Sequence, residues 1–71
     1  MNIYARMNLN QLYRALEAEN NGYTQRSVEA ADFRQRGLAV MANATQQAAG
    51  RHADNLTLIM NQIHQLEGGE S

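Results

Sequence analysis

The sequence predicts an all-α protein in which a short N-terminal helix and a long second helix pack as a helical hairpin or small bundle. Apolar residues recur at intervals of three and four, which is the spacing of one helix face. The chain contains no proline, the residue that most strongly interrupts helices. A heptad pattern runs through the second part of the chain and is typical of a coiled-coil-like seam. We expect one helical domain over residues 1–71, with residues 1–7 forming an N-terminal arm.

The first helix is expected over residues 8–21. Asn8 is a good N-cap because its side-chain oxygen can accept an orphan backbone N–H, and Gln11 completes a capping-box pattern three residues later. The apolar stripe that follows consists of Leu9, Leu12, Tyr13 and Leu16. The segment Asn20-Asn21-Gly22 predicts the end of this helix, with Gly22 in the left-handed position that follows many helices.

The second helix is expected over residues 24–49, with Thr24 as its N-cap. Gly37 is the one residue within it that disfavours a helix, at a cost of about 1 kcal/mol relative to Ala in an exposed position. Residues 51–67 are helical by the same apolar spacing, and residues 68–71 should form a flexible tail. Gly50 leaves two alternatives open: one continuous helix, or a turn at residues 50–54 that separates a third helix.

The heptad register favours the continuous helix. Two rows of positions seven apart begin at Val28 and Ala31, nine of their twelve members are apolar, and the register does not slip at Gly50. Small residues line the first half of this seam and bulky residues the second. We expect the small half to receive the first helix and the bulky half to lack a partner within the chain. The residues predicted to form a self-association surface are Leu38, Met41, Leu56, Ile59, Met60, Ile63 and Leu66.

The small size of the chain also predicts self-association. A chain of 71 residues buries a small share of its surface, and the absence of cysteine excludes disulfides that would compensate. Association is the remaining common remedy, most simply as a two-fold homodimer. No stretch approaches the roughly 18 apolar residues of a membrane span, and no signal peptide is recognisable, so we expect no membrane contact and a cytoplasmic location.

No catalytic or metal-binding set is recognisable in the sequence. His52 and His64 are twelve residues apart and cannot form the i, i+4 pair of a helical zinc site. No glycine-rich phosphate loop and no nucleophile beside a base are present. We therefore expect a protein that is not an enzyme and holds no metal or cofactor.

The basic residues do not predict a nucleic-acid surface. The net charge is −1, and the arginines expected on the long helix scatter around its axis, several of them beside acidic residues. An oligomer that gathers arginines from several chains could still bind a nucleotide or nucleic acid. We keep this as an alternative function.

The predicted function is protein binding by a homodimeric helical protein. The run over residues 39–65 resembles in composition the helical hairpins of bacterial signalling and secretion proteins, a likeness that transfers no residue role. We expect a small adaptor or steric inhibitor of a larger bacterial assembly, of the kind that phages and plasmids encode. A chaperone-like helical partner of one protein is a further alternative. The residues expected to contact a protein partner are Tyr4, Tyr13, Tyr23, Arg34 and Arg51.

Overall fold

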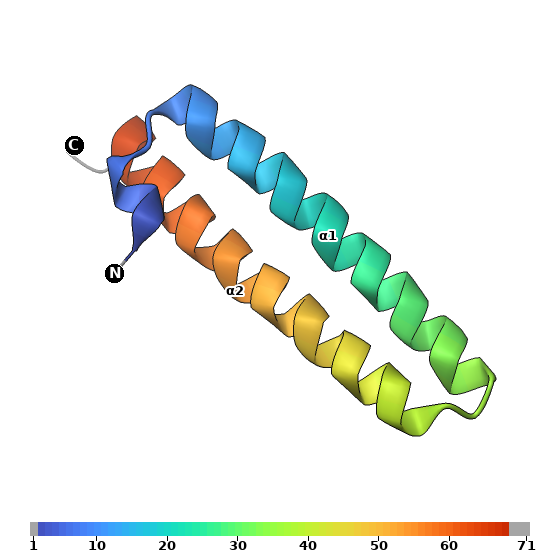
Figure 1. The fold of residues 1–71 in the computed structure, drawn as a ribbon. Coiled ribbons are helices and arrows are strands. Elements are labelled where there is room, and N and C mark those ends of the chain that lie inside the picture. Colours follow the sequence, from blue (N-terminus) through green and yellow to red (C-terminus); the bar gives the residue numbers. More distant parts are fainter. Residues whose placement is uncertain (1, 69–71) are drawn as a thin grey trace.

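The protein is an antiparallel pair of long helices with a short helical turn at its N-terminal end. The computed structural model describes residues 2–68. A 3-10 turn, η1, spans Ile3–Arg6, and it is followed by α1 (Leu9–Gln35) and α2 (Ala39–Gly68). The two long helices lie side by side, and η1 packs beside the C-terminal end of α2 (Figure 1). The molecule extends over 50 × 19 × 18 Å.

The start of α1 confirms the capping box. The Asn8 side-chain oxygen accepts the Gln11 backbone N–H at 2.9 Å, and the Gln11 side chain accepts the Asn8 backbone N–H at 3.0 Å. Two backbone donors that the first helical turn leaves without partners are thereby satisfied.

The predicted end of the first helix at residues 20–22 is wrong, because α1 continues through Gly22 to Gln35. The predicted helix over residues 24–49 is therefore divided between α1 and α2. The physical reason lies in what faces each glycine. Gly22 lies against the imidazole of His52 on α2, where the absence of a side chain allows close packing. Gly37, expected inside a helix, has φ of +77° and makes the turn.

The turn between the helices is a Schellman motif. The Leu38 N–H donates to the Phe33 carbonyl at 2.9 Å, and the Gly37 N–H donates to the Arg34 carbonyl at 3.1 Å. This pair of bonds satisfies two of the last carbonyls of α1 and requires a left-handed residue at Gly37. The chain thus reverses at residues 36–38.

Gly50 does not interrupt α2, which is one continuous helix from Ala39 to Gly68. All but one of the heptad positions within it are covered. Those that are buried are Ala42, Ala49, Ile59 and Ile63, those that are half-buried are Thr45, His52 and Leu56, and the exposed one is Leu66. The heptad rows do not continue as a seam on the α1 side of the turn, where Val28 is 64% exposed.

The interior has a bulky end and a small end. Tyr4, Leu12, Ile59 and Ile63 form the bulky cluster near the termini, with Leu9 and Leu16 packed against it. Toward the turn the buried residues are Ala30, Ala42 and Ala49. The expectation that the bulky half lacks an intrachain partner is wrong, because the first half of α1 and the η1 tyrosine cover it. No helix within residues 2–68 is long and apolar enough to cross a membrane.

Candidate interaction groove

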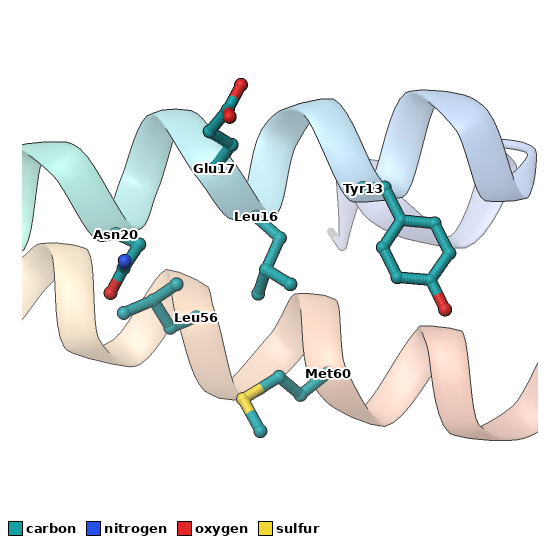
Figure 2. A pocket seen from close by; sticks show the side chains of 6 residues that line it. All are labelled: Tyr13, Leu16, Glu17, Asn20, Leu56 and Met60. Atoms are coloured by element: carbon teal, nitrogen blue, oxygen red, sulfur yellow. The ribbon is translucent and has the colours of Figure 1, made fainter.

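An open groove lies between α1 and α2 near the chain termini. Its walls come from Tyr13, Leu16, Glu17 and Asn20 of α1 and from Leu56 and Met60 of α2, and its volume is about 400 Å³. In Figure 2, Leu16 and Asn20 point toward α2 while Glu17 lies on the outer rim and points away. The side chains of Tyr13 and Met60 are 46% and 59% exposed. We refer to these six residues as the terminal groove.

Helix geometry explains why these residues share one side of the hairpin. Tyr13, Leu16, Glu17 and Asn20 follow one another at steps of three, one and three, and Leu56 and Met60 are four apart, so each set occupies one helix face. Leu16 belongs to the bulky core and also lines the groove. The groove is therefore the solvent-facing edge of the core.

Tyr13 is held in place at the end of the groove by Glu67. The Tyr13 hydroxyl donates a hydrogen bond to the Glu67 carboxylate at 2.5 Å between the oxygen atoms. This bond to the carboxylate raises the pKa of the Tyr13 hydroxyl, and desolvation adds to the rise. The Tyr13 ring is thus tethered at its hydroxyl while the residue stays 46% exposed, and an amphipathic side chain of this kind can serve as a binding anchor.

A polar cluster joins the two helices midway along the hairpin. Glu19 of α1 lies 2.8 Å from Nδ1 of His52 and accepts a hydrogen bond from the Asn55 side chain at 3.1 Å. The bond from His52 lowers the pKa of the Glu19 carboxyl, against the opposing effect of burial. The His52 ring rests on Gly22, where a Cβ would stand 2.6 Å from the ring carbon Cε1. These contacts fix the register of α1 against α2.

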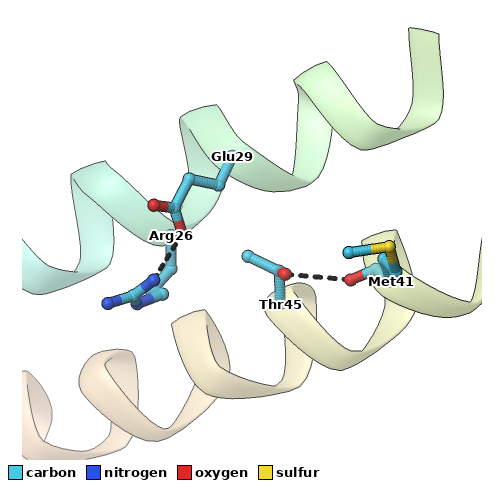
Figure 3. Close-up of polar contacts among 4 residues, drawn as sticks. All are labelled: Arg26, Glu29, Met41 and Thr45. Atoms are coloured by element: carbon cyan, nitrogen blue, oxygen red, sulfur yellow. Dashed lines mark hydrogen bonds and ion pairs between the residues drawn. The ribbon is translucent and has the colours of Figure 1, made fainter. Parts of the chain in front are cut away.

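The turn end of the hairpin carries mostly charged groups that are already paired. Arg26 and Glu29 of α1 form an ion pair one helical turn apart, and the Thr45 hydroxyl donates to the Met41 carbonyl at 2.9 Å (Figure 3). The Arg36 guanidinium lies 3.2 Å from the Asp32 carboxylate. A second groove of about 410 Å³ opens here beside Arg26 and Glu29, and its rim is charged.

The structure separates the predicted self-association residues into three groups by burial. Ile59 and Ile63 are buried within the chain, so they are covered without a second copy. Leu56 is half-buried at the terminal groove. The remaining residues of that set are exposed, and they are Leu38, Met41, Met60 and Leu66.

The predicted partner-binding residues also differ in exposure. Tyr4 is only 7% exposed and belongs to the core, so its prediction as a contact residue is wrong in this fold. Burial raises the pKa of its hydroxyl, and the charge of Glu19 adds to this. Tyr13 and Tyr23 are exposed on α1, Arg34 donates to the Gln46 side chain at 3.3 Å, and Arg51 is exposed on α2. Of this set, the terminal groove contains Tyr13 alone.

Sequence reasoning missed Glu17 and Asn20 in the groove and the whole Glu19–His52–Asn55 cluster. Glu17 and Asn20 stand four and seven residues after Tyr13, so their place on its face could have been found from helical spacing. The cluster could not, because it depends on where the chain reverses. Within residues 2–68 no group of three or more His, Asp or Glu side chains could hold a metal ion.

Comparison with known proteins gives no relative for this chain. No protein-family model, no curated protein and no solved structure matches it. The functional argument therefore depends on the chemistry of the groove and on the sequence.

Proposed function

We propose that the protein is a small non-enzymatic interaction protein that acts through helix packing, as an adaptor or steric inhibitor of a larger bacterial assembly. The surface it uses is the terminal groove, and the ligand that fits this groove is an amphipathic helix. The observation that carries the proposal is the open apolar wall formed by Tyr13, Leu16, Leu56 and Met60.

The geometry of two-helix packing supports a helical ligand. An amphipathic helix carries an apolar stripe at least about 100° wide, and contact with a single neighbouring helix leaves the edges of that stripe uncovered. A third helix laid along the terminal groove would cover Met60 and the face of Tyr13 together. Helix-in-groove recognition of this kind uses apolar anchors at positions i, i+3 or i+4, and i+7 of the bound helix.

The chemistry of the groove favours binding over turnover. Glu17 points away from α2 at the rim, and the Tyr13 hydroxyl is engaged by Glu67 (Figure 2). Among the six lining residues, no nucleophile lies beside a base. Specificity would come from the shape of the apolar wall and from the two polar groups at its rim, Glu17 and Asn20.

Affinity capture from the native host with matched variants tests this proposal. The wild-type chain, Met60→Asp and Val40→Asp serve as baits, since both replaced residues are exposed apolar side chains of α2 but only Met60 lines the groove. We expect Met60→Asp to recover a specific partner at less than about one tenth of the wild-type yield, because a desolvated carboxylate in an apolar contact is unfavourable. Val40→Asp should retain it. Equal recovery by all three baits, with unchanged helical circular dichroism, would contradict the proposal.

A further inference from the structure

The side of the hairpin that carries the terminal groove continues to the turn with a different chemistry. Residues at intervals of seven share one helix face, and the row on α1 that includes two groove residues consists of Tyr13, Asn20, Ser27 and Arg34. The corresponding row on α2 consists of Met60, Ala53 and Gln46. The hydrogen bond from Arg34 to Gln46 joins the two rows at the turn end. We refer to these seven residues as the groove flank.

The groove flank is arranged evenly about its own centre. On α1, the positions midway between Tyr13 and Arg34 are residues 23 and 24; on α2, the position midway between Met60 and Gln46 is Ala53. Gly22 lies against the His52 ring, next to both midpoints, so these midpoints lie at about the same level of the hairpin. A two-fold axis at this level, perpendicular to the long axis of the hairpin, would place the groove end of one copy on the turn end of another.

The middle of the groove flank carries small side chains. Ser27 and Ala53 lie there and are half-buried, whereas Tyr13 and Met60 at the groove end and Arg34 and Gln46 at the turn end are long. Small residues in the middle allow the backbones of two copies to approach closely.

The two ends of this side of the hairpin are complementary in charge. The groove end carries the carboxylates of Glu17 and Glu67, and the turn end carries the guanidinium of Arg34, which is bonded to the neutral Gln46. An antiparallel arrangement would bring Arg34 of one copy to the Tyr13 ring and the carboxylates of the other, where cation–π and ionic contacts can form. A parallel arrangement would instead place like charges together at both ends.

The sparse interior of the hairpin gives a reason for the pairing. Leu12 and Ile59 are its largest fully buried side chains, and the sequence has no cysteine for a disulfide. Chains of this size usually need an added source of stability, and self-association supplies one.

We infer that the groove of the isolated protein is occupied by a second copy of this chain, packed antiparallel through the groove flank as a two-fold four-helix bundle. The inference rests on the proposed function, since it names the first helix that the groove takes. A partner helix would then bind by replacing that second copy.

Sedimentation equilibrium measures the association directly. We expect the wild-type chain and Val40→Asp at high micromolar concentration to give twice the chain mass of 8.0 kDa, and the thermal midpoint to rise with protein concentration. Met60→Asp should weaken the dimer at least tenfold. A wild-type chain that is monomeric at this concentration would overturn the inference.

Disulfide cross-linking of single-cysteine variants tests the relative orientation of the two copies. The sequence has no cysteine of its own, so each variant carries one thiol. Thr24 and Glu17 lie on the row of α1 beside the flank, Thr24 next to its centre and Glu17 near one end, and both are exposed. In the antiparallel dimer Thr24→Cys should form an intermolecular disulfide under mild oxidation, and Glu17→Cys should not. Cross-linking of both variants would indicate the parallel arrangement, and cross-linking of neither would place the interface elsewhere; either result would overturn the inference.

The failures of the two proposals are distinguishable. A monomeric chain whose Met60→Asp variant loses a captured protein removes the self-association and retains the proposed function. A dimer that Met60→Asp disrupts, with no change in the captured proteins, retains the self-association and removes the proposed role of the groove in partner binding.

Discussion

Gly22 and Gly50 both lie inside helices, but their surroundings differ. A Cβ at Gly22 would overlap the His52 ring, whereas a Cβ at Gly50 would meet no atom within 4 Å. Glycine in a helix interior costs about 0.5–1 kcal/mol relative to alanine, so its presence at Gly22 requires a compensating contact. The imidazole of His52 is that contact, and it is positioned by Glu19 at 2.8 Å.

The two glycines give a matched pair of substitutions. Gly22→Ala should lower the free energy of unfolding by about 1 kcal/mol. The new methyl group displaces the His52 ring and breaks its hydrogen bond to the Glu19 carboxylate, and this loss is larger than the gain in helix propensity. Gly50→Ala should raise the free energy of unfolding by about 0.5–1 kcal/mol. Urea denaturation followed by circular dichroism measures both. A stabilising Gly22→Ala would show that the ring is not held in this position.

Glu19 should make the stability of the hairpin depend on pH in the acid range. Its pKa is lowered in the folded chain by the bond from His52, so its contribution is present above the ordinary pKa of 4.5 and is lost as the pH falls through the folded value. Glu19→Gln should therefore be less stable than the wild type by about 1 kcal/mol at neutral pH, a difference that disappears in acid. Denaturant titrations across this range provide the measurement, with Glu17→Gln as the exposed control. A difference that persists unchanged in acid would contradict the assignment.

Among the elements, the short turn η1 covers the bulky end of the core. Its Tyr4 fills the bulky end of the core with Leu12, Ile59 and Ile63, and the Asn2 side chain caps the turn by accepting the Tyr4 N–H at 3.0 Å. The N-terminal residues thus provide the cover that a two-helix hairpin cannot provide for its own end.

Tyr4 and Tyr23 separate the contributions of core and surface. Tyr4→Ala should lower the free energy of unfolding by about 3 kcal/mol, because it leaves a cavity beside Ile59 and Ile63. Tyr23→Ala, on the exposed face of α1, should change it by less than about 0.5 kcal/mol. Thermal melts of both variants at the same protein concentration make the comparison. Equal losses would mean that η1 does not pack as described.

The elements also show how far local sequence signals reach. The capping box at Asn8 and the heptad positions of α2 could be predicted because they depend on residues within one helix. The position of the turn could not, because Gly22 and Gly37 both have the chemistry of a helix stop. The contact between Gly22 and His52, thirty residues away, determines which of them is used. Local propensity was overridden by packing between the helices.

For the whole molecule, the position of the turn determines which residues meet. Moving the reversal from Gly22 to Gly37 places Tyr13 beside Met60 and Glu67 and covers Ile59 and Ile63 with α1 and η1. The sequence predicted Tyr13, Leu56 and Met60 as contact residues, but in two separate surfaces. They line one groove because α1 and α2 pack antiparallel. The spacing of residues within one helix does not predict which residues of the other helix lie opposite.

The helical conformation of an Asn-Gly step inside α1 has a consequence for the chemical ageing of the protein. In flexible chains Asn-Gly deamidates readily, because the glycine nitrogen attacks the asparagine side chain to form a cyclic imide. The helical backbone at Asn21 and Gly22 holds the Gly22 nitrogen in the hydrogen-bond pattern of α1, away from the side-chain carbonyl of Asn21. Conversion of Asn21 to aspartate and isoaspartate would therefore accumulate only when this part of α1 opens, so mass spectrometry of stored protein would record how often the middle of the hairpin unfolds.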